Sequence, residues 1–180
     1  MKKWFQTDIG LFLLKAAVIY VIWYIIYDLW VLPYTSFDLW VIHQTAGVAA
    51  ELLRTMHYLV FQLNRSIGIY GSPGLKLVNG CSGISEMALF AGLILAYPGR
   101  WIYRILFIMA GIGGIWVTNV ARIIALALVQ RFHPGLFQFT HHYSSTAVFY
   151  LVIFILLVIW VNWADKESAA RGSAELKSTA

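Results

Sequence analysis

Charged residues are scarce in this chain of 180 residues, because only 12% are Asp, Glu, Lys or Arg, whereas 61% are hydrophobic. An ordinary soluble domain is about 45–50% apolar and about 25% charged. A water-soluble fold of this size cannot bury so much apolar surface, so lipid must be the solvent for much of it. The composition therefore excludes an ordinary soluble domain and predicts an integral membrane protein.

Acidic residues and cysteine are scarcer still. The chain has 13 basic residues against 8 acidic ones, and a single cysteine, Cys81. The basic residues stand singly beside apolar stretches, which indicates orientation in a membrane rather than nucleic-acid binding. One cysteine excludes an intramolecular disulfide, so the thiol is either a small buried hydrophobe or a reactive group.

Four apolar stretches are long enough to be predicted membrane spans. They cover about residues 9–30, 82–97, 102–129 and 146–163. No small-residue cleavage site follows the first stretch, so it reads as a retained anchor rather than a signal peptide. Three glycines in the third stretch, Gly111, Gly113 and Gly114, predict close contact with a neighbouring helix.

The remaining segments are more polar. Charged and apolar residues alternate with helical spacing over about residues 37–63, which predicts an external amphipathic helix on the membrane surface. Residues 66–80 are rich in glycine and predict a turn-rich, hairpin-like segment. Residues 165–180 are predicted to be a polar, disordered cytoplasmic tail. The expected fold is therefore an all-α polytopic membrane protein with a single domain over residues 1–164.

The basic residues also predict the orientation. With four spans, both termini lie on the same side, and eight lysines and arginines fall on that side against four on the other. Cytoplasmic loops carry the excess of such residues, so both termini are expected in the cytoplasm.

These span directions bring three reactive residue types to one face of the membrane. Cys81 lies just before the outer end of the second span, and His141 just before that of the fourth. Arg122 lies twenty residues beyond Ile102, or about 30 Å along a helix, at the outer boundary of the hydrocarbon. A thiol, a guanidinium and an imidazole are therefore predicted to meet at the external face.

Cys81 stands in Asn-Gly-Cys-Ser-Gly, at a junction between loop and helix. Free backbone N–H groups at a helix start favour a thiolate and can hold a developing oxyanion, which predicts a nucleophile. The alternative is a packing cysteine, the commoner role in membrane helices.

Arg122 follows Asn119 on the same helical face, which predicts a polar stripe that points into the bundle. Its permanent charge suits it to hold a thiolate, an oxyanion or a substrate carboxylate, and the alternative is an interfacial arginine that reaches toward the headgroups. Glu86 is expected to pair with Arg122 or Asn119 or to orient the histidine, and a purely structural salt bridge is its alternative role.

A cysteine nucleophile also needs a group that protonates the leaving amine, and histidine suits this near neutral pH. His141 and His142 are the candidates. A zinc site of His133, His141 and His142 is the alternative, but its spacing matches no helical ligand motif and no acidic ligand is close in sequence, so no metal is predicted.

Three short motifs in this order resemble the exosortase/archaeosortase family. They are Asn79-Gly80-Cys81-Ser82-Gly83, Asn119-Val120-Ala121-Arg122 and Phe139-Thr140-His141. The resemblance covers roughly residues 72–149 and is greatest to the small single-domain bacterial members.

The resemblance implies a membrane-embedded cysteine peptidase or transpeptidase in the plasma (inner) membrane, with its active site on the external or periplasmic side and no cofactor. Its substrates would be exported proteins whose C-terminal sorting signal consists of a short motif, a transmembrane helix and a basic tail. A lipid-linked or polysaccharide-linked group in the membrane would be the acceptor.

The resemblance also implies roles for individual residues. Cys81 matches the nucleophile, Arg122 the family's arginine and His141, by its register, the family's histidine. Supporting or substrate-binding positions are then Asn119, Glu86, Ser82 and His142. Two other classes stay open: a non-catalytic membrane scaffold or transporter subunit, and a metal-dependent intramembrane hydrolase.

Overall fold

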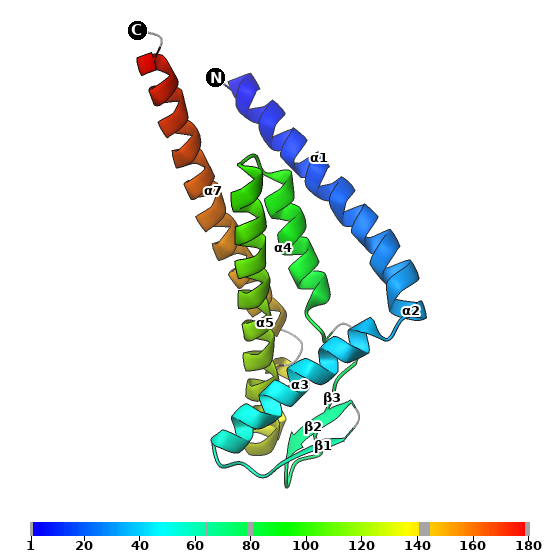
Figure 1. The fold of residues 1–180 in the computed structure, drawn as a ribbon. Coiled ribbons are helices and arrows are strands. Elements are labelled where there is room, and N and C mark those ends of the chain that lie inside the picture. Colours follow the sequence, from blue (N-terminus) through cyan, green and yellow to red (C-terminus); the bar gives the residue numbers. More distant parts are fainter. Residues whose placement is uncertain (1, 64, 79–80, 141–144, 179–180) are drawn as a thin grey trace.

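The computed structural model describes residues 2–63, 65–78, 81–140 and 145–178. Its long helices are α1 (Lys2–Ile26), α4 (Ile84–Ala96), α5 (Trp101–Phe132) and α7 (Ser145–Ser178). They run along the long axis of the molecule, with α4 in contact with α1, α5 and α7 (Figure 1). A further helix, α3 (Phe37–Thr55), crosses at one end, where a small sheet also lies (Figure 1). The described ends of α1 and α7 lie at the opposite end.

Three helical segments have the length and apolar character of membrane spans, namely Gly10–Tyr34, Trp101–Phe132 and Ala147–Lys166. The stretch predicted as the second span is a helix too, but α4 has only 13 residues, or about 20 Å, against about 30 Å of hydrocarbon. The structure thus contains three helices of spanning length and one shorter apolar helix among its described residues, rather than four equal spans.

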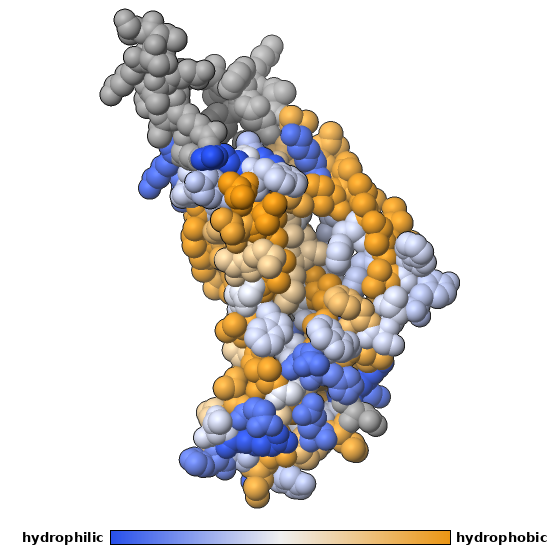
Figure 2. All heavy atoms as spheres, in the orientation of Figure 1, coloured by the Kyte–Doolittle hydropathy of each residue, from blue (hydrophilic) through white to orange (hydrophobic). Residues whose placement is uncertain are grey.

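The surface hydropathy differs between the helical bundle and the end of the molecule that holds α3 and the sheet. Hydrophobic residues dominate the middle of the face shown in Figure 2, and hydrophilic residues gather over the end that holds α3 and the sheet. Large apolar side chains such as Leu14, Val21 and Ile25 are exposed along α1. Such surface is stable only in an apolar solvent, so the prediction of a membrane protein agrees with the fold.

The first helix continues further than predicted and then turns sharply. A π-helical turn, η1 (Tyr27–Val31), and a short helix, α2 (Leu32–Tyr34), follow α1 directly. Tyr27 is buried and donates a hydrogen bond of 2.8 Å to the equally buried Asp38 at the start of α3. This bond ties the end of the first span to α3.

The helix predicted over 37–63 is shorter, because α3 ends at Thr55. His57 adopts a left-handed φ of 67°, its N–H donates to the carbonyl of Arg54, and the N–H of Tyr58 donates to that of Leu53. This pair of bonds is a Schellman motif, which ends a helix by satisfying its last carbonyls. The prediction of one helix to residue 63 was therefore wrong, since hydrophobic spacing cannot reveal a left-handed residue.

The chain after α3 forms an antiparallel sheet of three strands, β1 (Val60–Leu63), β2 (Ser66–Ile69) and β3 (Leu75–Lys76), in the order β1-β2-β3. The strands β2 and β3 confirm the expected hairpin within 66–80. The fold is thus mainly helical, as predicted, and the small sheet extends the expected hairpin by the strand β1.

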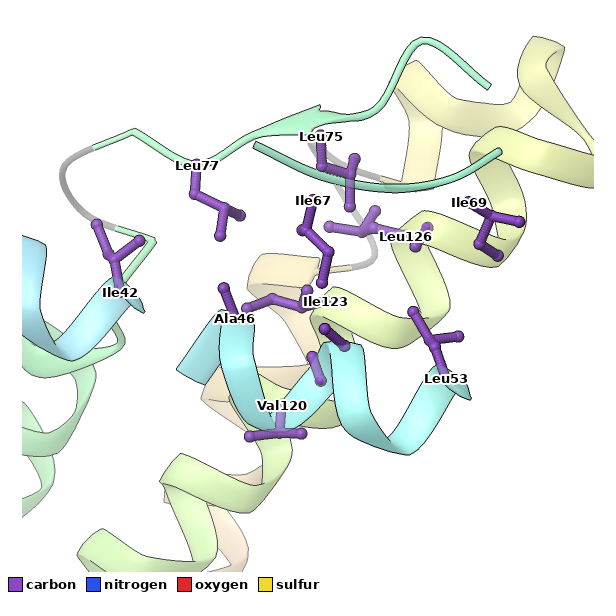
Figure 3. Packing of buried hydrophobic residues seen from close by; sticks show 13 residues of the cluster. Ile42, Ala46, Leu53, Ile67, Ile69, Leu75, Leu77, Val120, Ile123 and Leu126 are labelled. Atoms are coloured by element: carbon purple, nitrogen blue, oxygen red, sulfur yellow. The ribbon is translucent and has the colours of Figure 1, made fainter. Parts of the chain in front are cut away.

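One hydrophobic cluster joins α3, the sheet and the last third of α5. Its side chains point toward one another in Figure 3, from Ala46 and Leu53 of α3, Ile67 of β2 and Ile123 and Leu126 of α5. The 32 residues of α5 measure about 48 Å, so the helix extends beyond the hydrocarbon and supports this layer. Arg122 lies where α5 enters it.

A second cluster holds α4, α5 and α7 together within the bundle. Phe90 is completely buried there, and a Cβ atom on Gly111 would come within 2.2 Å of its ring. The predicted close helix contact is therefore correct at Gly111. It is wrong at Gly113 and Gly114, where a Cβ atom would meet none of the described residues within 4 Å.

The tail predicted to be disordered is helical, because α7 continues to Ser178. Adding residues to an existing helix is much easier than nucleating one, and Ala, Glu, Lys and Arg in this segment are good helix formers. Polar composition excludes a packed core for residues 165–178, but it does not exclude an extension of the last span.

Candidate active site

Cys81 lies in the short connection between the sheet and α4. Its N–H donates a hydrogen bond of 3.0 Å to the carbonyl of Val78, and its side chain is half-buried against the cluster of α3, the sheet and α5. Since α4 begins at Ile84, Cys81 stands just before the N-terminal end of that helix. The predicted junction between loop and helix is correct.

Arg122 brings its guanidinium to the thiol. The distance from its Nη2 atom to the Cys81 Sγ atom is 4.0 Å. The guanidinium carbon lies 5.5 Å from the centre of the Phe149 ring, so α7 supports it from the other side by a cation–π contact. A fixed positive charge this close stabilises negative charge that develops beside it.

Asn119 holds the backbone of the cysteine segment in place. The side chain is fully buried, and its Nδ2 atom donates hydrogen bonds of 3.0 Å to the carbonyls of both Cys81 and Ser82. Arg122 lies one helical turn further along α5. One face of α5 therefore fixes the position of Cys81 and also supplies the charge beside its sulfur.

The conformation of Gly83 allows Asn119 to approach the cysteine segment. It has a φ of 79°, and a Cβ atom there would lie 3.2 Å from the Asn119 Nδ2 atom. Any other residue would be strained in this conformation and would crowd the amide. The glycine after Cys81-Ser82 is thus required by the bond that positions the cysteine.

Two further residues predicted to support the site, Ser82 and Glu86, are also among the described residues. Ser82 is buried, and its Oγ atom accepts a long hydrogen bond of 3.4 Å from the N–H of Ile84, the first residue of α4. Glu86 is half-buried, and its Oε2 atom has no hydrogen-bond partner among the described residues. The expected pairing of Glu86 with Arg122 or Asn119 is absent from that part of the chain.

A cavity of about 370 Å³ opens on the cysteine and arginine. It is lined by Cys81 and Arg122, by the chain segment 74–78, and by Gln130 and Phe137. A second cavity of about 230 Å³ lies on the other side of Arg122, between α5 and α7. Arg122 therefore lines two spaces, one of which reaches the thiol.

His141 and His142 lie outside the described residues. The chain on both sides of them reaches Arg122, since Thr140 and Phe149 line the smaller cavity with it. His133, the third residue of the alternative zinc site, is exposed at the end of α5. Within the described ranges, no group of three or more His, Cys, Asp or Glu is placed to hold a metal.

Two polar groups near the site were missed by the sequence analysis. Gln130 is 9% exposed, and its Nε2 atom donates a bond of 3.0 Å to the carbonyl of Gly74. It lies three helical turns beyond Asn119 on the same face of α5, a spacing that could have revealed it. The buried pair of Tyr27 and Asp38 had no comparable signal, because it forms between two elements.

A family model described as transmembrane exosortase matches residues 4–158 of the chain. The matched region contains the first two spanning helices, most of the third, the sheet and both Cys81 and Arg122. Comparison with curated proteins gives no match, and comparison with solved structures gives none either.

Proposed function

The chain belongs to the transmembrane exosortase family, and we propose that it is a membrane-embedded cysteine transpeptidase that cleaves the C-terminal sorting signal of exported proteins. The observation that carries this proposal is the 4.0 Å approach of the Arg122 guanidinium to the Cys81 sulfur within one cavity. A structural cysteine needs neither an adjacent cation nor an open space in front of its sulfur.

The first half of the reaction follows from this pair. The Cys81 thiolate attacks the scissile carbonyl carbon, and an S–C bond forms while the carbonyl oxygen becomes an oxyanion. Arg122 stabilises that charge, as do backbone N–H groups at the start of α4. The C–N bond then breaks, and His141 gives its proton to the leaving amine, which leaves a thioester on Cys81.

The second half regenerates the enzyme. His141 takes a proton from the acceptor nucleophile, which attacks the thioester carbonyl and displaces the Cys81 thiolate. A lipid-linked or polysaccharide-linked acceptor gives transfer, and water gives hydrolysis. His141 rather than His142 is proposed for this role from the family register, with Glu86 and His142 as supporting groups.

The fold also supports an orientation of the chain in the membrane that suits this reaction. The described ends of α1 and α7 lie at the end of the molecule opposite α3 and the sheet (Figure 1). With the basic excess at the terminal end, we place both termini in the cytoplasm and Cys81 at the external face of the plasma membrane.

The test is processing of a co-expressed exported protein that ends in a motif, an apolar helix and a basic tail. Cys81→Ala and Arg122→Ala should both remain inserted in the membrane and should both leave this substrate uncleaved. Asn162→Leu, on the exposed face of α7, is the control and should process it normally. Cleavage by both site variants would refute the enzyme and favour a scaffold.

A further inference from the structure

The free edge of β3 faces away from the rest of the sheet. The N–H of Leu77 donates 2.7 Å to the carbonyl of Arg65, so Leu77 is hydrogen-bonded toward β2. Bonded and non-bonded positions alternate along antiparallel strands, so the N–H and C=O of Lys76 point to the opposite edge. The carbonyls of Gly74 and Val78 turn the same way, because they accept from Gln130 and from the N–H of Cys81.

This edge is a wall of the cavity that contains the thiol. Residues 74–78 line that cavity together with Cys81 and Arg122. Leu75 and Leu77 are each 5% exposed and pack into the cluster behind the strand, so the edge is held firmly while Lys76 is exposed. Proteins usually cover or block a free strand edge. Here the described chain leaves it open beside the nucleophile.

Gln130 provides a second, independent feature of the same wall. Its amide nitrogen anchors the Gly74 carbonyl, whereas its Oε1 atom is buried and has no partner among the described residues. A buried acceptor without a partner destabilises the fold. An N–H group of a ligand in the cavity would satisfy it, and an extended peptide carries such groups at every second position along one edge.

We propose that the substrate segment around the scissile bond binds in extended form along the free edge of β3 at Lys76, with one of its N–H groups donated to Gln130 Oε1. The proposal rests on the proposed function and specifies how that enzyme recognises its substrate. Backbone pairing supplies affinity for any extended segment, and the side chains at alternate positions supply selectivity.

Site-directed disulfide formation tests this arrangement. Because Cys81 is the only cysteine, Cys81→Ala removes every thiol, and the double variant C81A/K76C then carries one thiol at the strand edge. This variant is co-expressed with substrates that carry one cysteine at successive positions around the cleavage site. Disulfides require Cα atoms about 4.4–6.8 Å apart, so they report close neighbours. The matched control is C81A/K166C, with the thiol in α7.

The expected result is crosslinking to one substrate position and, more weakly, to the positions two residues before and after it, with none to the directly adjacent positions and none with the control. A period of three to four positions would mean a helical substrate, and it would overturn the proposal, as would an absence of crosslinks. The single variant C81A separates the two claims. If C81A still cleaves the substrate, the proposed enzyme itself is refuted. If C81A is inactive but the crosslinks of C81A/K76C do not alternate along the substrate, only the strand pairing is refuted.

Gln130→Leu gives a second measurement. We expect processing to fall roughly 2-fold to 10-fold for each lost hydrogen bond to the substrate, and to recover as substrate expression is raised. Alkylation of Cys81 by a small reagent should keep its rate, because the thiol itself is untouched. Gln62→Leu on exposed β1 is the matched control. An equal fall in alkylation would mean that Gln130 acts only through the cysteine segment, which overturns its binding role.

Discussion

Replacement of Asn119 by leucine should displace Cys81 while leaving the thiol and the Arg122 guanidinium chemically unchanged. Leucine branches at the same carbon as asparagine but replaces the amide by methyl groups, so both amide donors are lost. Two carbonyls, those of Cys81 and Ser82, then lack the hydrogen bonds of 3.0 Å that hold them. The cysteine segment would be free to leave its position beside Arg122.

The magnitude follows from these two bonds. Each is worth about 0.5–1.5 kcal/mol, so their loss amounts to about 1–3 kcal/mol. If that free energy is expressed as a lower population of the reactive arrangement, substrate processing falls roughly 5-fold to 150-fold. Substrate processing by the Asn119→Asp variant should fall at least as far, because a carboxylate has the same shape as the amide but cannot donate to a carbonyl.

Two assays measure the effect. One follows cleavage of a co-expressed substrate, and the other follows alkylation of Cys81 by a membrane-impermeant reagent, which is unambiguous because the chain has one cysteine. Asn162→Leu makes the same chemical change on the exposed face of α7 and should alter neither rate. Normal processing by N119D in a correctly inserted protein would refute the reasoning, since it would show that the two donors do not position the thiol.

Three further predictions concern residues around the site and the bundle. Arg122→Lys keeps the charge but loses the planar group that lies over Phe149, so processing should fall by more than tenfold at unchanged expression. Tyr27→Phe leaves a buried carboxylate at Asp38 without its donor, and thermal unfolding in detergent should show a loss of about 1–3 kcal/mol. Burial, followed by the hydrogen bond to Asp165 and the charge of that residue, raises the pKa of Tyr97 to about 12. The neutral phenol is thus favoured in the folded protein, so this contribution to stability is complete below about pH 10 and is lost as the pH rises through 12. A difference titration of tyrosinate absorbance against Tyr97→Phe checks the value, and ionisation near pH 10 would contradict it.

The sequence predicted three helices of spanning length and the meeting of Cys81 and Arg122 for one physical reason. Apolar stretches that cross a membrane have fixed directions, so the depth of each residue follows from its distance along a helix. The 4.0 Å approach of guanidinium and sulfur agrees with that expectation. The bond from Asn119 to the cysteine segment was suggested only in outline, as a polar stripe on α5.

Other features depend on information that no local pattern contains. The end of α3 is set by one left-handed residue, His57, and by two backbone bonds. The strand β1 follows within a stretch whose apolar spacing also suits a helix. The pairing of Tyr27 with Asp38 joins two helical segments on either side of a sharp turn, and the approach of Gln130 to Gly74 joins elements far apart in the chain. Only the packed fold reveals either contact.

The central claim is that Cys81 carries the acyl group during cleavage. Hydroxylamine attacks thioesters, so it can replace the natural acceptor at this step. With active enzyme, substrate and added hydroxylamine, mass spectrometry should find a hydroxamate at the new C-terminus of the cleaved substrate, and Cys81→Ala should yield none. Cleavage that proceeds normally in hydroxylamine without any hydroxamate, or a hydroxamate formed equally by Cys81→Ala, would contradict the thioester.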